Sequence, residues 1–150
     1  MKVQKIPWPW TPLTNRAGEP TVGVTRIDLV CGPAIEQTAE ALTRRWARDR
    51  ALRGPITERL ATLALTATEH GLRFAPRGLT LQIRWLDLDR IRLEVRWHGC
   101  SSTAHPSTRD PSRSRNEIEQ VAAILDEMAD EWGITSDARA PVHWMVLDTR

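Results

Sequence analysis

The stretch that decides the fold is GPITERLATLALTATEHG, which runs from Gly54 to Gly71. Its apolar residues recur at helical spacing and surround the middle of the stretch, which predicts a helix buried under a sheet. Thr62 and Thr66 are the polar exceptions and lie four residues apart on one face. Their hydroxyls either bond back to the preceding turn or point into a pocket, and back-bonding is the default for Thr in a helix.

Length and composition limit the class of protein. The 150 residues suffice for one domain with a core, and the net charge of +2 gives no case for nucleic acid as a direct partner. No apolar run approaches a membrane span and no signal-peptide pattern precedes the domain, so we expect a cytoplasmic protein without a membrane partner. Cys31 and Cys100 are far apart, and the histidines lack paired ligand spacing. We therefore expect reduced thiols and no metal site.

The chain divides into a short arm and one domain. Residues 1–20 contain PWPWTPL, in which alternating Pro and Trp predicts an extended arm. The arm either packs over its own domain or docks on a partner, and packing on its own domain is favoured because exposed Trp is costly. Residues 21–150 are expected to form the single domain.

The first part of this domain predicts a strand, two helices and a hairpin. The strand is expected over Thr21–Cys31, with a bulge near Thr25 because the apolar phase slips there. A helix follows from Pro33 to about Arg50, ahead of the buried helix. Alternating apolar and polar residues then predict an antiparallel hairpin formed by Leu79–Arg84 and Arg90–Arg96.

The last third of the chain begins with a polar stretch. Residues 99–116 are rich in Ser, Thr and Pro and predict a mobile, lid-like loop. Asn116 is the expected cap of a last helix that ends at Gly133, and Pro141–Leu147 is the expected last strand. The expected buried face of that helix comprises Ile118, Val121, Ala122, Leu125, Ala129 and Trp132. This order predicts an α+β fold: a two-layer sandwich of a largely antiparallel mixed sheet with helices on one face.

This order resembles the histidine-kinase-like ATPase fold, also called the GHKL or Bergerat fold. Within that fold it is most similar to the small bacterial anti-sigma-factor serine kinases. Three stretches carry the resemblance: LATLALTATEHG, IRLEVRWHG, and LDEMADEWG followed by PVHWMVL. In the last of these, the residues that fit the family pattern are Ala129, Asp130, Trp132, Gly133, Val142 and Trp144. The resemblance implies a domain derived from ATP-dependent regulators that switch between protein partners.

The resemblance places a nucleotide site on the buried helix, but its chemistry has changed. The catalytic Glu and the magnesium-binding Asn of the family correspond to Thr62 and Thr66. Neutral hydroxyls cannot act as a general base near neutral pH and make a poorer magnesium site.

The other two nucleotide motifs of the family have changed as well. Its Asp-x-Gly motif, whose Asp binds the adenine amino group, corresponds here to a stretch from Trp97 to Gly99, so the acceptor is lost and only Gly99 remains. Its Gly-x-Gly motif, which meets the phosphates, falls at Ile118 and Gln120, whose side chains obstruct close backbone approach. The loss of three motifs predicts a degenerate nucleotide site and no cofactor.

The favoured function is a non-catalytic regulatory module, or pseudokinase, that acts by protein contact. By resemblance its partner is a sigma factor, an anti-sigma antagonist or another transcription regulator, and a homodimer is open. The resemblance implies a partner contact around the first helix, so Arg44, Arg45 and Arg48 on its exposed side are the candidates for binding an acidic partner segment. The alternative interpretation of these arginines is an ordinary solvated helix face.

Two other functions remain as alternatives. The first is an active ATP-dependent protein serine kinase, with ATP and magnesium as cofactors, Glu69 as a substitute base and His98 as an adenine contact. A surface Glu before a helix end is the favoured interpretation of Glu69. The second is an adaptor of a DNA-bound transcription regulator, in which the arm and a loop with three arginines contact protein or DNA. Those arginines are Arg109, Arg113 and Arg115.

Overall fold

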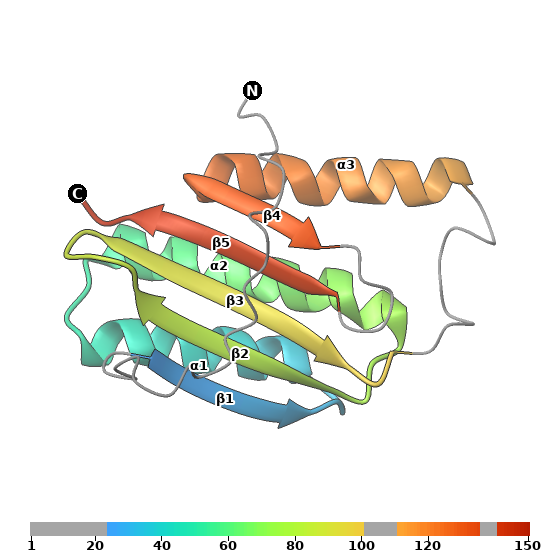
Figure 1. Cartoon of the computed structure of the whole chain (residues 1–150), viewed down its shortest axis with the longest axis horizontal. Coiled ribbons are helices and arrows are strands. Elements are labelled where there is room, and N and C mark those ends of the chain that lie inside the picture. The colour runs from blue at the N-terminus through green and yellow to red at the C-terminus, as the bar shows by residue number, and fades with distance from the viewer. Residues whose placement is uncertain (1–23, 101–110, 136–140) are drawn as a thin grey trace, which may run out of the picture.

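The computed structural model describes residues 24–100, 111–135 and 141–150 (Figure 1). The expected N-terminal arm, residues 1–20, lies outside these ranges, as does the middle of the expected lid loop. The elements are β1 (Val24–Val30), α1 (Ile35–Asp49), α2 (Gly54–Gly71), the 3₁₀ helix η1 (Leu72–Phe74), β2 (Gly78–Trp85), β3 (Arg90–His98), α3 (Pro111–Met128), β4 (Glu131–Thr135) and β5 (Val142–Asp148).

The described strands form one sheet in the order β1-β2-β3-β5-β4, and the helices lie behind it on one face (Figure 1). This confirms the predicted α+β architecture. Each pairing among the described strands is antiparallel, so the expectation of a mixed sheet is wrong. The buried helix is confirmed with the bounds expected from the sequence, Gly54–Gly71.

The inner face of the sheet, which faces the helices, forms the core. Its residues follow the alternation expected for the hairpin, and each is at most 1% exposed: Leu79, Leu81, Ile83, Ile91, Leu93, Val95, Trp97, His143, Met145 and Leu147. The helix α2 meets this face with Leu60, Leu63, Ala64 and Ala67, which are fully buried. Each large aliphatic side chain buried in this way contributes about 1.5–3 kcal/mol to folding, so the contact between α2 and the sheet contributes several kcal/mol to stability.

The strand β1 is regular, which corrects the expected bulge near Thr25. Its pairing with β2 runs without interruption from Val24 opposite Arg84 to Val30 opposite Gly78. The apolar phase changes because Val24 faces the side of the sheet away from the helices. Thr25 faces the helices, and its hydroxyl accepts a hydrogen bond from Nε1 of Trp46 at 2.9 Å. The sequence pattern suggested a bulge only because Thr25, a polar residue, takes an inward position that is usually apolar.

The start of α3 also differs from the sequence prediction. The helix begins at Pro111, so the last part of the expected loop 99–116 is helical and Asn116 is not its cap. Pro is favoured in a first helical turn because its fixed φ suits the helix and its missing N–H is not needed there. Ile118 is 50% exposed and does not belong to the buried face, whereas Leu125 and Ala129 are buried.

The end of α3 gives way to a strand that the sequence did not predict. The helix ends at Met128, and Trp132 and Gly133 lie in β4, paired with β5. Nε1 of Trp132 donates to Oδ1 of Asp126 at 2.9 Å, which fastens the strand to the helix it follows. A Cβ on Gly133 would lie 2.6 Å from the indole of Trp144, so this glycine serves close packing and not a helix end.

Both cysteines are free and partly buried. Burial raises the pKa of the Cys31 and Cys100 thiols, which keeps them protonated near neutral pH. Within the described ranges, every helix is too short or too polar to cross a membrane.

Candidate functional site

Thr62 and Thr66 lie on the side of α2 that faces α3. Arg59, one turn before Thr62, donates through Nε to a backbone carbonyl at the end of α3 at 2.9 Å, and Arg73 in η1 pairs with Glu117 near the start of α3. The Thr66 hydroxyl donates to the carbonyl oxygen of Thr62 at 2.8 Å. This confirms that Thr66 bonds back to its own helix. Its proton is engaged there and is not presented to a ligand.

Trp97 occupies the interior at the place that the family resemblance assigns to adenine. It is fully buried on the inner face of β3, and its indole lies against Gly71 at the end of α2. A Cβ on Gly71 would overlap the ring, so this glycine allows the indole to reach the helix backbone. Trp97, which the resemblance aligns with an adenine acceptor, therefore fills space in the core.

A buried pair of histidines continues from this indole. Nε1 of Trp97 lies 3.5 Å from Nδ1 of His143, and Nε2 of His143 lies 2.7 Å from Nδ1 of His70. An indole N–H can only donate, so Nδ1 of His143 accepts and its Nε2 carries the proton that is donated to His70. We call these three residues the histidine–tryptophan cluster.

Both histidines of the cluster are neutral. His143 is fully buried, and burial lowers its pKa to about 3, with a further lowering by His70. Burial also lowers the pKa of His70 to about 4, with a smaller effect of the nearby Arg73. Sequence reasoning missed this pair because the two residues are far apart in the chain. The sequence feature that could have predicted a buried histidine is the position of His143, which alternation places on the inner face of an otherwise apolar strand.

The remaining positions of the expected nucleotide site are spread over the surface. Gly99 follows β3 with a φ of 65° and lies against the side chain of Arg77. Glu69 is exposed, in agreement with its interpretation as a surface residue, and Gln120 on α3 is exposed as well. His98 lies on the opposite side of the sheet from its neighbour in sequence, so it does not join the histidine–tryptophan cluster.

The three arginines predicted to bind a partner share one surface of α1. They line a shallow hollow together with Gln37, Glu40, Ala41 and Asp49. Arg44 donates to Glu40 at 2.8 Å and pairs with Glu58 of α2, and these hydrogen bonds raise its pKa. Arg45 lies 3.8 Å from Asp49, a long contact between two exposed side chains, and Arg48 is exposed in the last turn of the helix. We call this surface the arginine face.

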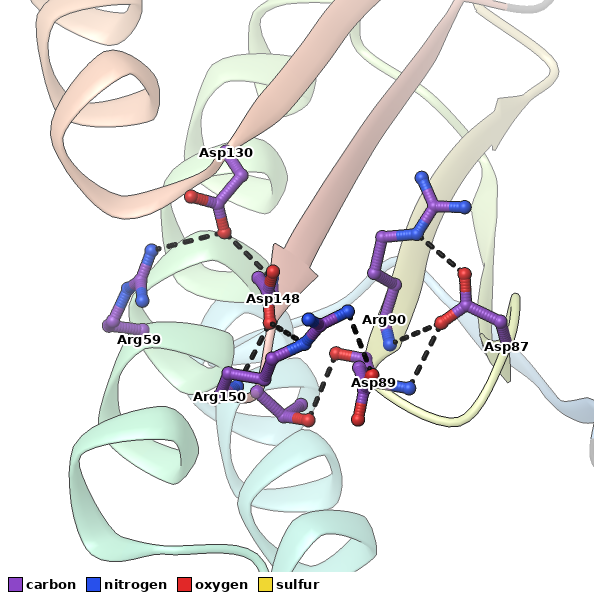
Figure 2. Close-up of polar contacts among 8 residues, drawn as sticks. Arg59, Asp87, Asp89, Arg90, Asp130, Asp148 and Arg150 are labelled. Atoms are coloured by element: carbon purple, nitrogen blue, oxygen red, sulfur yellow. Dashed lines mark hydrogen bonds and ion pairs between the residues drawn. The ribbon is translucent and has the colours of Figure 1, made fainter.

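A second charged group holds the C-terminal residues against the sheet (Figure 2). Arg150 lies 2.9 Å from the carboxylate of Asp89 in the turn between β2 and β3, and the backbone N–H of Thr149 donates to the carbonyl of Asp89 at 2.7 Å. The N–H of Asp148 donates to the carboxylate of Asp130 at 2.7 Å. These contacts are structural, because each carboxylate is held by a partner within the fold. Among the described residues no His, Cys, Asp and Glu cluster is suited to a metal ion.

No protein-family model matches the chain, and no curated protein matches it. The function must therefore be argued from the residues and their geometry. Two regions are candidates for a functional site: the buried interior beside α2 and the exposed arginine face of α1.

Proposed function

We propose that the protein is a non-catalytic regulatory module that binds an acidic segment of a protein partner through the arginine face. The observation that carries this proposal is the hollow on α1, because all three arginines predicted from the sequence line it. Guanidinium groups bind carboxylates through paired hydrogen bonds, so clustered arginines suit an acidic peptide segment. By resemblance, the first candidates for the partner are a sigma factor, an anti-sigma antagonist or another transcription regulator.

The arginines have different roles in this proposal. Arg44 is held by Glu40 and Glu58 and therefore links α1 to α2 and shapes the hollow. Arg45 and Arg48 reach further into solvent and supply the charge that meets the partner. The weak contact between Arg45 and Asp49 costs little to break, because exposed ion pairs are worth at most about 1 kcal/mol.

The interior beside α2 supports the non-catalytic part of the proposal. The Thr66 hydroxyl is bonded to its own helix, and the histidine–tryptophan cluster packs against Gly71 under the end of that helix. A neutral hydroxyl in this state offers neither a general base nor a good magnesium ligand. Contact with a partner, and not phosphoryl transfer, is the activity that these residues support.

The test is the affinity for a sigma factor or antagonist partner, measured by biolayer interferometry. Arg45→Glu combined with Arg48→Glu should weaken binding by about 2 kcal/mol or more, roughly 30-fold, because two attractive contacts become repulsive. Arg53→Glu combined with Arg77→Glu is the matched control, since both residues are exposed and lie off the arginine face. Equal affinities of the two double variants would remove the arginine face from the proposal.

A further inference from the structure

The outer face of the sheet, which is turned away from the described helices, is buried at its centre. On the central strands this face comprises Thr80, Gln82 and Arg84 of β2, Arg92, Glu94 and Arg96 of β3, and Val142, Trp144 and Val146 of β5. Glu94, Val142, Trp144 and Val146 are each only 3% exposed. By contrast, Val30 at one end of β1 is 87% exposed on the same face. Burial is therefore local to the central strands.

The described helices do not account for this burial. Figure 1 shows them on one side of the sheet, and α2 contacts β3 and β5 from that side. Trp46 of α1 forms a hydrogen bond with Thr25 of β1, and Asp126 of α3 forms one with Trp132 of β4. Thr25 and Trp132 both lie on the inner face of the sheet. Elements that are tied to the inner face cannot cover Trp144 from the other side.

Neighbouring side chains cover Trp144 only in part. Its indole packs over Gly133 on one side, and the guanidinium of Arg92 lies 5.0 Å from its ring centroid. Nε of Arg84 and Nε of Arg92 are themselves buried without a hydrogen bond to a described residue, although Nε of Arg92 forms an ion pair with Oε2 of Glu94 at 3.4 Å. Arginines on a water-facing sheet extend into solvent and hydrogen-bond to water. Buried arginine nitrogens therefore indicate that a further group excludes water from this face.

The chain outside the described ranges supplies a segment of suitable chemistry. Residues 1–23 lead directly into Val24, which itself lies on the outer face opposite Arg84. This segment carries Trp8, Trp10 and four prolines. Indole rings stack favourably on guanidinium groups, and proline lacks an N–H that would be left unbonded on an apolar surface.

The segment is also long enough. The distance from β1 to β5 is three strand spacings, about 14 Å. Roughly 14 residues separate Trp10 from Val24, and an extended chain covers about 3.1 Å per residue, or about 43 Å. The tryptophans can therefore reach the centre of the outer face with slack for a turn at the edge.

We propose that residues 1–23 dock on the outer face of the sheet, with Trp8 or Trp10 placed over Arg92 and Trp144. In this arrangement residues 1–23 shield the central strands of their own domain from solvent. This inference is independent of the proposed partner site, which lies on α1 on the other side of the molecule.

The test is fluorine NMR of the full-length chain labelled with 5-fluorotryptophan. Each of the seven tryptophans gives one signal, which is assigned through Trp→Phe variants. A soluble gadolinium chelate then reports how exposed each indole is. We expect Trp144 and at least one of Trp8 and Trp10 to be protected in the unmodified protein. Trp8→Ala combined with Trp10→Ala should raise the relaxation enhancement of Trp144 several-fold.

The core residue Trp97 is the internal control, since its signal must keep its dispersion and protection if the variant remains folded. The proposal is overturned if Trp144 stays protected in the double variant, or if Trp8 and Trp10 are both as accessible as in a free peptide. The second result is read in the unmodified protein and so does not depend on a variant that folds. Protection of Trp144 that disappears on dilution would assign the cover to a second copy of the chain and would also overturn the proposal.

Discussion

Mild acid should destabilise the fold through the two buried histidines. His70 and His143 have pKa values lowered by burial to about 4 and about 3 in the folded protein, whereas an unfolded chain gives them a pKa of about 6.5. The unfolded state therefore binds more protons below pH 6.5. The histidine contribution to stability is complete above that pH and is lost as the pH falls from about 6.5 to about 4 for His70 and to about 3 for His143.

The size of the effect follows from the protonation of the unfolded chain. At pH 5 both histidines are still neutral in the folded protein but are protonated in the unfolded one. Each pH unit below 6.5 costs about 1.4 kcal/mol per histidine, so each contributes a loss of about 2 kcal/mol and the pair about 4 kcal/mol. A domain of this size is stable by only about 5–15 kcal/mol, so the loss is large. The carboxylates Asp28 and Asp87, whose pKa values are lowered, remain ionised at pH 5.

The assay is urea unfolding followed by far-ultraviolet circular dichroism at pH 7.5, 6.5, 5.5 and 5.0. His70→Gln should roughly halve the loss between pH 7.5 and pH 5, because one titrating group is removed while an acceptor for Nε2 of His143 is kept. His98→Gln is the control for the loss of an imidazole, because His98 lies on the opposite side of the sheet, where its Nε2 contacts the Thr80 hydroxyl at 2.6 Å and neither buried histidine. A wild-type urea midpoint that is equal at pH 7.5 and pH 5 would refute the burial of two neutral histidines.

The other predictions concern α2. Gly71→Ala should destabilise the fold by about 3 kcal/mol in urea unfolding, because the added methyl overlaps the indole of Trp97. Gly54→Ala is its control and should have little effect, since nothing lies within 4 Å of the added atom; equal losses would refute the packing of Trp97 against the helix. Thr62→Ala combined with Thr66→Ala should leave partner affinity unchanged in the interferometry assay, and a loss of affinity in a folded variant would give these hydroxyls a role in function.

The sequence predicted those elements whose pattern is local. The hairpin follows from strict alternation, and the structure pairs Leu79 with Trp97 and Ile83 with Leu93 on one face. The ends of α2 agree with the prediction, because a glycine and a proline mark its start and an apolar stretch with helical periodicity follows them. Such patterns need no knowledge of distant parts of the chain.

Features that depend on distant contacts were missed. The strand β4 is short, and a glycine at position 133 is also typical of a helix end. The conformation of β4 depends on its pairing with β5 and on the packing of Gly133 against the indole of Trp144. The contact between His70 and His143 joins two elements far apart in the chain, so no spacing rule could find it. The positions of the candidate site were predicted only through the family resemblance. Helical periodicity predicted that the three arginines share one face of the first helix, and the family resemblance singled out that face as a partner site.

We propose that this domain regulates by protein contact and does not use a nucleotide, and titration calorimetry measures nucleotide binding directly. The purified full-length protein is titrated with magnesium-ATP and with ADP to millimolar concentration, and thermal unfolding is measured with and without each ligand. We predict no saturable heat and no stabilisation. Saturable binding, with a gain of about 2.7 kcal/mol in the free energy of unfolding at 100 times the Kd, would contradict the account and make the protein serine kinase the leading alternative.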